Sequence, residues 1–362
     1  MAAVMLFLCV PGCSSERTKA VMELDGVSIG ADVYRYWLST FKYYFVQNYE
    51  DIEDTVECWN KEMDDGLTIG EYVEKYTLQY AKNVLCALKL YKDYKLSLSK
   101  SVINNIDDTI DDMIKYQYGD SKSEFNNALM ATYGMDLDGL RNAFIMEAKV
   151  DAVESYLFGE NGTQVPTNAE VDAFYKENYS RLLMIVVNTS YELILDDKGN
   201  VTLDDKGEVA IKEYTEEEIA QKKAKAQEAF DKANAGEEFE KLVEKYNELT
   251  VEECPNGFYI TNYEFETLVA GGYDSKALSE VLKMKEGDIY RYEDEESISI
   301  VKKVPLIEKA YSSKDDAEQL SDIQSHLITK KYNEILQQMW DDIVVEEYVS
   351  TLKTVDVKKG FI

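Results

Sequence analysis

The stretch that decides the fold is AFDKANAGEEFEKLVEKY, which occupies residues 229–246. Its first part continues a helix that a capping box opens at Thr215 and Glu218. Gly236 ends this helix, because glycine readily takes the left-handed conformation found just after helices. Apolar residues then recur at helical spacing, at Phe239, Leu242, Val243 and Tyr246. The stretch therefore predicts two consecutive helices that a glycine separates.

Short strands are predicted on both sides of these helices. Leu182–Val187 is a compact apolar run suited to a buried strand. Further strands are expected at Gly257–Ile260, Asp288–Tyr292 and Ser297–Val304. Helices and strands alternate here without long parallel crossovers, so residues 166–306 are expected to form a small α+β domain.

A near repeat inside this domain predicts an inserted hairpin. Residues 196–201 have the sequence DDKGNV, and residues 204–209 have DDKGEV. Acidic residues beside glycine can bind calcium, but the liganding pattern D-x-[DN]-x-[DN]-G is not met. Two glycine-containing turns explain the repeat. We therefore expect a hairpin insertion near 188–214, and we predict no metal site and no cofactor.

The chain before this domain is expected to be helical after a first short hairpin around Asp25-Gly26. Five aromatic residues recur at helical spacing and line one face of the first helix: Tyr34, Trp37, Phe41, Tyr44 and Phe45. Thr68 and Glu71 form a capping box for a later helix. A break rich in glycine at 159–167 ends this helical domain, which we place at residues 21–165.

The last predicted element is a long helix from Ser313 to about Leu352. Its apolar residues recur on one side: Leu320, Ile323, Leu327, Ile335, Met339 and Ile343. The only histidine of the chain, His326, lies beside this apolar stripe, where a surface or flanking role is expected. The segment 307–362 is therefore treated as a separate C-terminal part.

The first residues indicate a signal segment and a lipid anchor. Residues 1–10 are apolar and uncharged, and they are too few to cross a bilayer, which takes about 20 apolar residues. They fit the apolar region of a secretory signal. A small residue, Gly12, directly precedes Cys13, which resembles the bacterial lipobox. We expect Cys13 to be lipidated and residues 1–20 to act as signal and tether; a frayed apolar terminus of a cytosolic protein is the alternative.

Composition excludes several classes of function. The 362 residues carry a net charge of −31, which disfavours binding to nucleic-acid phosphates and to an anionic membrane surface. With one histidine, a histidine pair or a histidine-rich metal site is impossible. Cys58, Cys86 and Cys254 are odd in number and contain no C-x-x-C, so no disulfide framework is predicted. No Ser-His-Asp or phosphate-loop pattern is present.

The order of these parts resembles the SurA/PrsA family of exported foldases. The opening VMELDGVSIGADVY, residues 21–34, is similar to the family's first hairpin and helix start. Leu137–Arg141, with Gly134 before it, resembles a conserved helix entry. Residues 229–246 resemble the signature of the parvulin-type peptidyl-prolyl isomerase domain, and Leu282 with Gly287–Ile289 resembles its later element.

This resemblance implies an α+β multidomain fold. A mostly helical N-terminal chaperone domain would be completed by the C-terminal helix, which packs back on it. A parvulin-like domain with a four-stranded antiparallel sheet would be inserted between them. Residues 21–165, 166–306 and 307–362 correspond to these three parts.

The resemblance also bears on catalysis. Active parvulins carry a histidine on the first strand and another on the last, but Leu182–Val187 contains none and Ser299 occupies the second position. The groove residues of the family would fall near Gly271 and Ser275. No catalytic residue is therefore assigned, and little or no isomerase activity is expected.

The resemblance and the aromatic helix together indicate a lipid-anchored chaperone on the outer face of the cytoplasmic membrane. Unfolded exported polypeptides would be its clients, and Tyr34, Trp37, Phe41, Tyr44 and Phe45 are the candidate client contacts. The alternative is that Tyr34, Trp37, Phe41 and Phe45 are core residues, and for any single one of these a core position is the favoured interpretation. A homodimer remains an alternative to a single chain, an active isomerase is the second functional hypothesis, and a solute-binding lipoprotein ranks below both.

Overall fold

A computed structural model describes residues 18–49, 51–63, 66–196, 201–248, 254–342, 346–347 and 357–358. The chain divides into two compact units. Unit 1 comprises residues 1–165 and 328–362, and unit 2 comprises residues 166–327. Each unit has its own apolar core, so each is described by itself.

Unit 1 is mostly helical. Its helices are α1 (Ala31–Asn48), α2 (Val56–Trp59), α3 (Ile69–Asp93), α4 (Lys100–Tyr118), α5 (Lys122–Thr132), α6 (Leu137–Phe158) and most of α12 (Ile323–Asp342). Its strands β1 (Ala20–Leu24), β2 (Val27–Gly30) and β9 (Glu346–Glu347) form an antiparallel sheet in the order β2-β1-β9. Asp25 and Gly26 both have positive φ, as the tight turn of the predicted hairpin requires.

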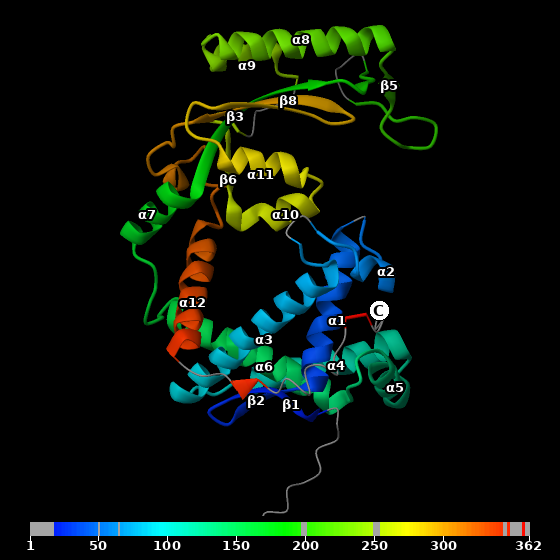
Figure 1. The fold of residues 1–362 in the computed structure, drawn as a ribbon, viewed down its shortest axis with the longest axis vertical. Helices are drawn as coiled ribbons and strands as arrows, with labels where there is room; N and C mark the ends of the chain where they lie inside the picture. The colour runs from blue at the N-terminus through cyan, green and yellow to red at the C-terminus, as the bar shows by residue number, and fades with distance from the viewer. Residues whose placement is uncertain are drawn as a thin grey trace, which may run out of the picture. The chain divides into compact units, whose positions relative to one another are not determined.

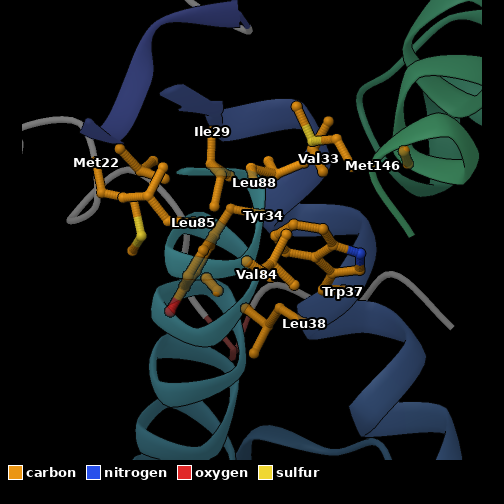
Figure 2. Close-up of a cluster of buried hydrophobic side chains, with 14 of the residues drawn as sticks. Met22, Ile29, Val33, Tyr34, Trp37, Leu38, Val84, Leu85, Leu88 and Met146 are labelled. Carbon is orange, nitrogen blue, oxygen red and sulfur yellow. The ribbon is translucent and has the colours of Figure 1, made fainter. Parts of the chain in front are cut away.

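The core of unit 1 joins elements far apart in the sequence. Figure 2 shows Tyr34 and Trp37 of α1 directed toward Val84 and Leu85 of α3. From α12, Tyr332 and Leu336 belong to the same cluster of buried side chains. The expectation that the C-terminal helix completes the helical domain is therefore confirmed.

Unit 2 is an α+β domain. Its helices are α7 (Asn168–Asn178), α8 (Glu216–Asn234), α9 (Phe239–Tyr246), α10 (Phe265–Ala270) and α11 (Ser275–Lys283), with short helices η2 (Asn262–Glu264) and η3 (Ala310–Ser312). Its strands are β3 (Tyr179–Asn188), β4 (Tyr191–Leu193), β5 (Ile211–Glu213), β6 (Phe258–Thr261), β7 (Ile289–Glu293) and β8 (Ser297–Val304). Strands β6-β3-β8-β7 form the antiparallel four-stranded sheet that was expected.

Helices cover both faces of this sheet (Figure 1). Helices α8 and α9 bury Ile185 and Ile300 on one face, while α11 packs on Leu182 and Val301 on the other. Successive strand residues point to opposite faces, so one strand serves both cores. In residues 229–246 the buried side chains are Ala229, Ala233, Phe239, Leu242 and Tyr246. Small alanines let α8 approach the sheet closely, while the larger side chains of α9 fill the space beside it.

The insertion contains strands β4 and β5, which pair antiparallel from Tyr191 with Glu213 to Leu193 with Ile211. In the second glycine turn, Asp204 Oδ1 accepts hydrogen bonds from the backbone N–H groups of Lys206 and Glu208 at 2.8 and 3.0 Å. Gly207 has φ of 83°, which glycine adopts without strain. The described part of this turn is therefore stabilised by its own side chain and backbone.

The terminal helix begins later than the apolar pattern predicted. Helix α12 starts at Ile323 instead of Ser313; before it, Ser313 and Asp316 hydrogen-bond to each other in a turn. Leu320 and Leu327 pack in unit 2 beside α7, so the boundary between the units falls within α12. The pattern of apolar residues could not distinguish a helix from a turn that packs its apolar side chains.

Among the described residues, no helix combines the length and apolarity needed to cross a membrane. The same residues contain no group of three or more His, Cys, Asp or Glu side chains that could hold a metal ion.

Candidate functional site

The aromatic face of α1 is buried at its N-terminal end and partly exposed further along the helix. Tyr34 and Trp37 are 3% and 2% exposed, and the indole Nε1 of Trp37 donates a hydrogen bond to Glu147 Oε1 at 3.2 Å. These two side chains belong to the core of unit 1 and leave no surface for a client. Of the other three candidates, Tyr44 is exposed, while Phe41 and Phe45 are half-buried and pack against the same core.

Phe41, Tyr44 and Phe45 join tyrosines of α3. The Phe41 ring lies edge-on to Tyr76 and Tyr80, at centroid distances of 4.8 and 5.2 Å. Phe45 contacts Tyr72 at 5.8 Å, and Tyr44 at 5.8 Å. We call this set the aromatic surface; it consists of Phe41, Tyr44, Phe45, Tyr72, Tyr76 and Tyr80.

Two rings of the aromatic surface are widely exposed. Tyr44 has 40% and Tyr76 has 49% of its surface accessible. Edge-to-face pairs such as these are favourable by about 1 kcal/mol beyond the area they bury. The neighbouring rings therefore hold the exposed rings in place, so a ligand would meet an ordered surface. The tyrosines of α3 fit its helical pattern in the sequence, but only the fold brings them beside α1.

A cleft of about 420 Å³ opens beside the aromatic surface. Its lining residues are Tyr76, Gln79, Tyr80 and Asn83 of α3 with Asn333, Gln337 and Trp340 of α12. Tyr76 and Tyr80 belong to both the cleft and the aromatic surface, so the two features are continuous. The Lys82 ammonium lies 5.0 Å from the ring centroid of Trp340.

Carboxylates of α6 set the electrostatics behind the rings. Burial raises the pKa of Glu147, the Trp37 hydrogen bond opposes this shift, and the nearby charge of Asp151 adds to it. Burial and the charge of Glu147 raise the pKa of Tyr36 to about 12. The same causes, together with Asp151, raise the pKa of Tyr80. The phenols of Tyr36 and Tyr80 are therefore neutral at physiological pH.

Ser299 lies on β8, between Val186 of β3 and Tyr292 of β7 in the strand register. Its neighbours Ile298 and Ile300 are fully buried under α8 and α9. Strand alternation therefore directs Ser299 to the opposite face, which α11 covers in part. Ser299 is half-buried there.

The other residues singled out from the sequence are not part of a group of side chains that could carry out a reaction. Gly271 ends α10, and Ser275 begins α11. The ring nitrogen Nδ1 of His326 is 2.7 Å from the Tyr179 hydroxyl at the start of β3. Burial lowers the pKa of this half-buried histidine. Cys13 lies outside the described residues.

A second cavity, of about 660 Å³, lies in unit 2 at the edge of the sheet. Residues from α8, α11, β7 and β8 line it, among them Met284, Tyr290 and Lys302. Lys302 also lies over the Phe239 ring, at 5.7 Å from its centroid. Sequence patterns gave no sign of this cavity, because its lining residues belong to four separate elements.

Comparison with known proteins found no matching family model and no matching curated protein. Among solved structures, PrsA from Bacillus subtilis is similar at 18% identity, with 81% of this chain and 90% of that chain covered and a TM-score of 0.22. The peptidylprolyl isomerase PrsA from Bacillus cereus has 14% identity, coverage of 82% and 95%, and a TM-score of 0.27. The foldase protein PrsA from Streptococcus pneumoniae has 16% identity, coverage of 78% and 89%, and a TM-score of 0.22. The matched region covers most of this chain in all three comparisons, at low identity and low TM-score.

Proposed function

We propose that this protein is an extracytoplasmic chaperone or foldase, which binds unfolded exported polypeptides on the aromatic surface of unit 1. The observation that carries this proposal is the exposure of Tyr44 and Tyr76 on two packed helices. Tyrosine offers a large contact area at a low cost in conformational entropy, and it suits many different apolar partners. A folded protein exposes little apolar surface that could bind these tyrosines, whereas an unfolded chain exposes its apolar residues.

The net charge of −31 supports the same proposal. A strongly charged carrier keeps a complex with an apolar client in solution, because like charges repel one complex from the next. The charge also disfavours contact between the protein body and anionic lipid. Clients would therefore be met in solution and would not be held against a bilayer.

Suppression of client aggregation tests the proposal. We expect the purified protein in excess to reduce light scattering from a thermally unfolding model client. Tyr44→Ala combined with Tyr76→Ala removes the two most exposed rings of the aromatic surface. We expect this variant to bind the client about tenfold more weakly, as the loss of two apolar contacts implies.

The matched control is Tyr116→Ala on α4. Tyr116 is 75% exposed, and it lies outside the aromatic surface. This control separates loss of the site from loss of any exposed tyrosine. If the unmodified protein gives no protection, or if Tyr116→Ala weakens binding as much as the double variant, the proposal is wrong.

We further propose that unit 2 contains a parvulin-like domain with little or no prolyl isomerase activity. Ser299 stands where the family resemblance expects a histidine, and Leu182–Val187 supplies none. Isomerisation requires a site that favours the twisted imide over the planar one, against an uncatalysed barrier of about 18–20 kcal/mol. An assay on short X-Pro peptides should give the rate of buffer alone; faster turnover would favour the alternative of an active isomerase.

Anchoring through a lipid on Cys13 is part of the same proposal. The support is the apolar run of residues 1–10 and the small residue before Cys13. Metabolic labelling with a fatty acid should mark the unmodified protein and leave Cys13→Ser unlabelled. Labelling of both proteins, or of neither, would contradict an anchor at this residue.

A further inference from the structure

The cleft beside the aromatic surface is lined by an unusual combination of side chains. Four of its seven lining residues have side chains that end in a carboxamide group, namely Gln79, Asn83, Asn333 and Gln337. The other three are the aromatic residues Tyr76, Tyr80 and Trp340. None of the seven carries a formal charge at neutral pH, and the raised pKa of Tyr80 keeps that phenol protonated. A ligand of this cleft would meet hydrogen-bonding groups and rings without a fixed charge in the lining.

Helical geometry places these residues as two facing stripes. On α3, Tyr76, Gln79, Tyr80 and Asn83 follow the spacing of one helical face. On α12, Asn333, Gln337 and Trp340 follow the same kind of spacing. Two helices thus present mixed aromatic and carboxamide stripes toward one space.

The carboxamides are available for a ligand. Within the described part of the chain, none of the four makes a hydrogen bond. Elsewhere, comparable amides are used internally: Asn48, Asn60 and Asn178 each donate to a backbone carbonyl one turn earlier. Gln79, Asn333 and Gln337 are exposed, and Asn83 is half-buried. The four groups are therefore free to pair with a molecule in the cleft.

We propose that this cleft binds the main chain of an extended segment of a client polypeptide, through its four carboxamides. This inference rests on the proposed chaperone function and assigns it a second mode of recognition. Each carboxamide offers an acceptor oxygen and two donor hydrogens. Each peptide unit offers one donor and one acceptor, and carries no net charge. The lining therefore complements a peptide backbone, whose chemistry is the same in every client.

The length of the cleft stripe on α3 sets the number of client residues that it can bind. From Tyr76 to Asn83 the stripe on α3 rises about 10 Å, at 1.5 Å per helical residue. An extended chain advances about 3.3 Å per residue, so about three client residues span the stripe. Client side chains at the Tyr76 end would then reach the aromatic surface, to which Tyr76 and Tyr80 belong. Binding of the main chain makes the site tolerant of client sequence, while the rings supply preference for apolar segments.

An oligosaccharide is the competing occupant, because rings and amides also bind sugars. Continuity with the aromatic surface favours a polypeptide, since the rings shared with that surface extend the site along one path. A charged ligand is disfavoured because the lining offers no ion of opposite sign. The test therefore includes a sugar as a separate probe.

The experiment measures binding of a capped, uncharged peptide of Ala, Leu and Phe, labelled with a fluorophore, to the full chain by anisotropy. Gln79→Met with Gln337→Met removes two carboxamides and keeps side-chain length and helix propensity. We expect the dissociation constant to rise about tenfold in this variant, the effect of losing two neutral hydrogen bonds. Gln338→Met is the matched control: it is exposed on α12 but does not line the cleft, and binding should stay unchanged.

A second probe keeps the side chains and removes the backbone donors. The same peptide, N-methylated at alternate residues, should bind the unmodified protein about tenfold more weakly. In the Gln79→Met/Gln337→Met variant, N-methylation should weaken binding less than tenfold, because only Asn83 and Asn333 remain to pair with the peptide backbone. Far-UV circular dichroism should be the same for all variants, because none of the replaced groups makes a hydrogen bond in the described structure.

The outcomes separate this inference from the proposed function. Suppose that the protein protects clients and that the Tyr44→Ala/Tyr76→Ala variant weakens this protection. If the carboxamide variants and N-methylation of the peptide then leave binding unchanged, the inferred recognition of the main chain is wrong and the chaperone proposal stands. If the unmodified protein neither protects clients nor binds the peptide, both are wrong. If a chito-oligosaccharide binds, and only its binding depends on Gln79 and Gln337, the cleft is a sugar site and the inference is overturned.

Discussion

At the scale of single residues, burial and partners decide the role of each polar side chain. Tyr246 has its ring in the core of unit 2, while its hydroxyl donates to Glu228 Oε1 at 2.6 Å. Lys232 and Lys245 each donate to the same hydroxyl at 2.9 Å. The bonds from Lys232 and Tyr246 hold the pKa of Glu228 at about 2. The ring of Tyr246 therefore packs in the apolar core while its hydroxyl bonds to charged side chains at the surface. Tyr246 is also the last residue of α9.

Glu264 carries the opposite shift and yields a prediction about pH. Burial, with the nearby charge of Asp322, raises its pKa to about 6. A raised pKa means that the folded state binds the proton more tightly than the unfolded state, so this group lowers stability as pH rises from about 4.5 to about 6. We expect Glu264→Gln to raise the melting temperature at pH 7.5 and to leave it unchanged at pH 4.

Circular dichroism melts at both pH values provide the measurement. Glu237→Gln, which removes an exposed carboxylate of the same unit, is the control and should have little effect at either pH. An equal gain from Glu264→Gln at both values would contradict the assigned shift.

At the scale of elements, caps and turns fix where helices begin and end. Capping boxes are present at both predicted positions, Thr68 and Thr215, and also at Thr167; each threonine side chain accepts from the backbone N–H three residues later. At the other end of α8, Gly236 has φ of 88° and separates α8 from α9. These bonds satisfy backbone groups that a helix leaves free at its ends.

Gly236 gives the prediction at this scale. A Cβ added there meets no atom within 4 Å, so its whole cost is backbone strain at positive φ. We expect Gly236→Ala to lower the free energy of unfolding of unit 2 by about 1 kcal/mol. Gly236→Asn should cost less, because asparagine tolerates the left-handed region better. Urea unfolding followed by far-UV circular dichroism measures both; an equal loss in the two variants would show that the side chain clashes after all.

At the scale of the whole molecule, two separate cores predict two unfolding transitions. All three tryptophans, Trp37, Trp59 and Trp340, belong to unit 1. Tryptophan fluorescence therefore reports unit 1, while far-UV circular dichroism reports both units. We expect the two signals to give different urea midpoints, and Gly236→Ala to shift only the circular dichroism transition. Coincident transitions that shift together would show that the two units unfold as one.

The sequence predicted those parts of the fold that depend on neighbours along the chain. Capping boxes join residues three apart, the hairpin at Asp25-Gly26 needs two adjacent residues, and the helices of 229–246 follow from spacing. The α+β class of unit 2 follows from the same local patterns. Each of these signals is complete within a few residues, so no distant contact is needed to find it.

The candidate site depended on contacts between distant segments. The sequence pattern placed Tyr34, Trp37, Phe41, Tyr44 and Phe45 on one face of α1. It could not distinguish which of them are buried and which are exposed. Packing against α3 buries Tyr34 and Trp37 and leaves Tyr44 exposed, because the core covers only one end of that face. The carboxamides of α3 and α12 meet only after the C-terminal helix has packed on unit 1. Local periodicity sets which residues share a face; only tertiary packing decides which part of that face meets solvent and which distant side chains meet across a cleft.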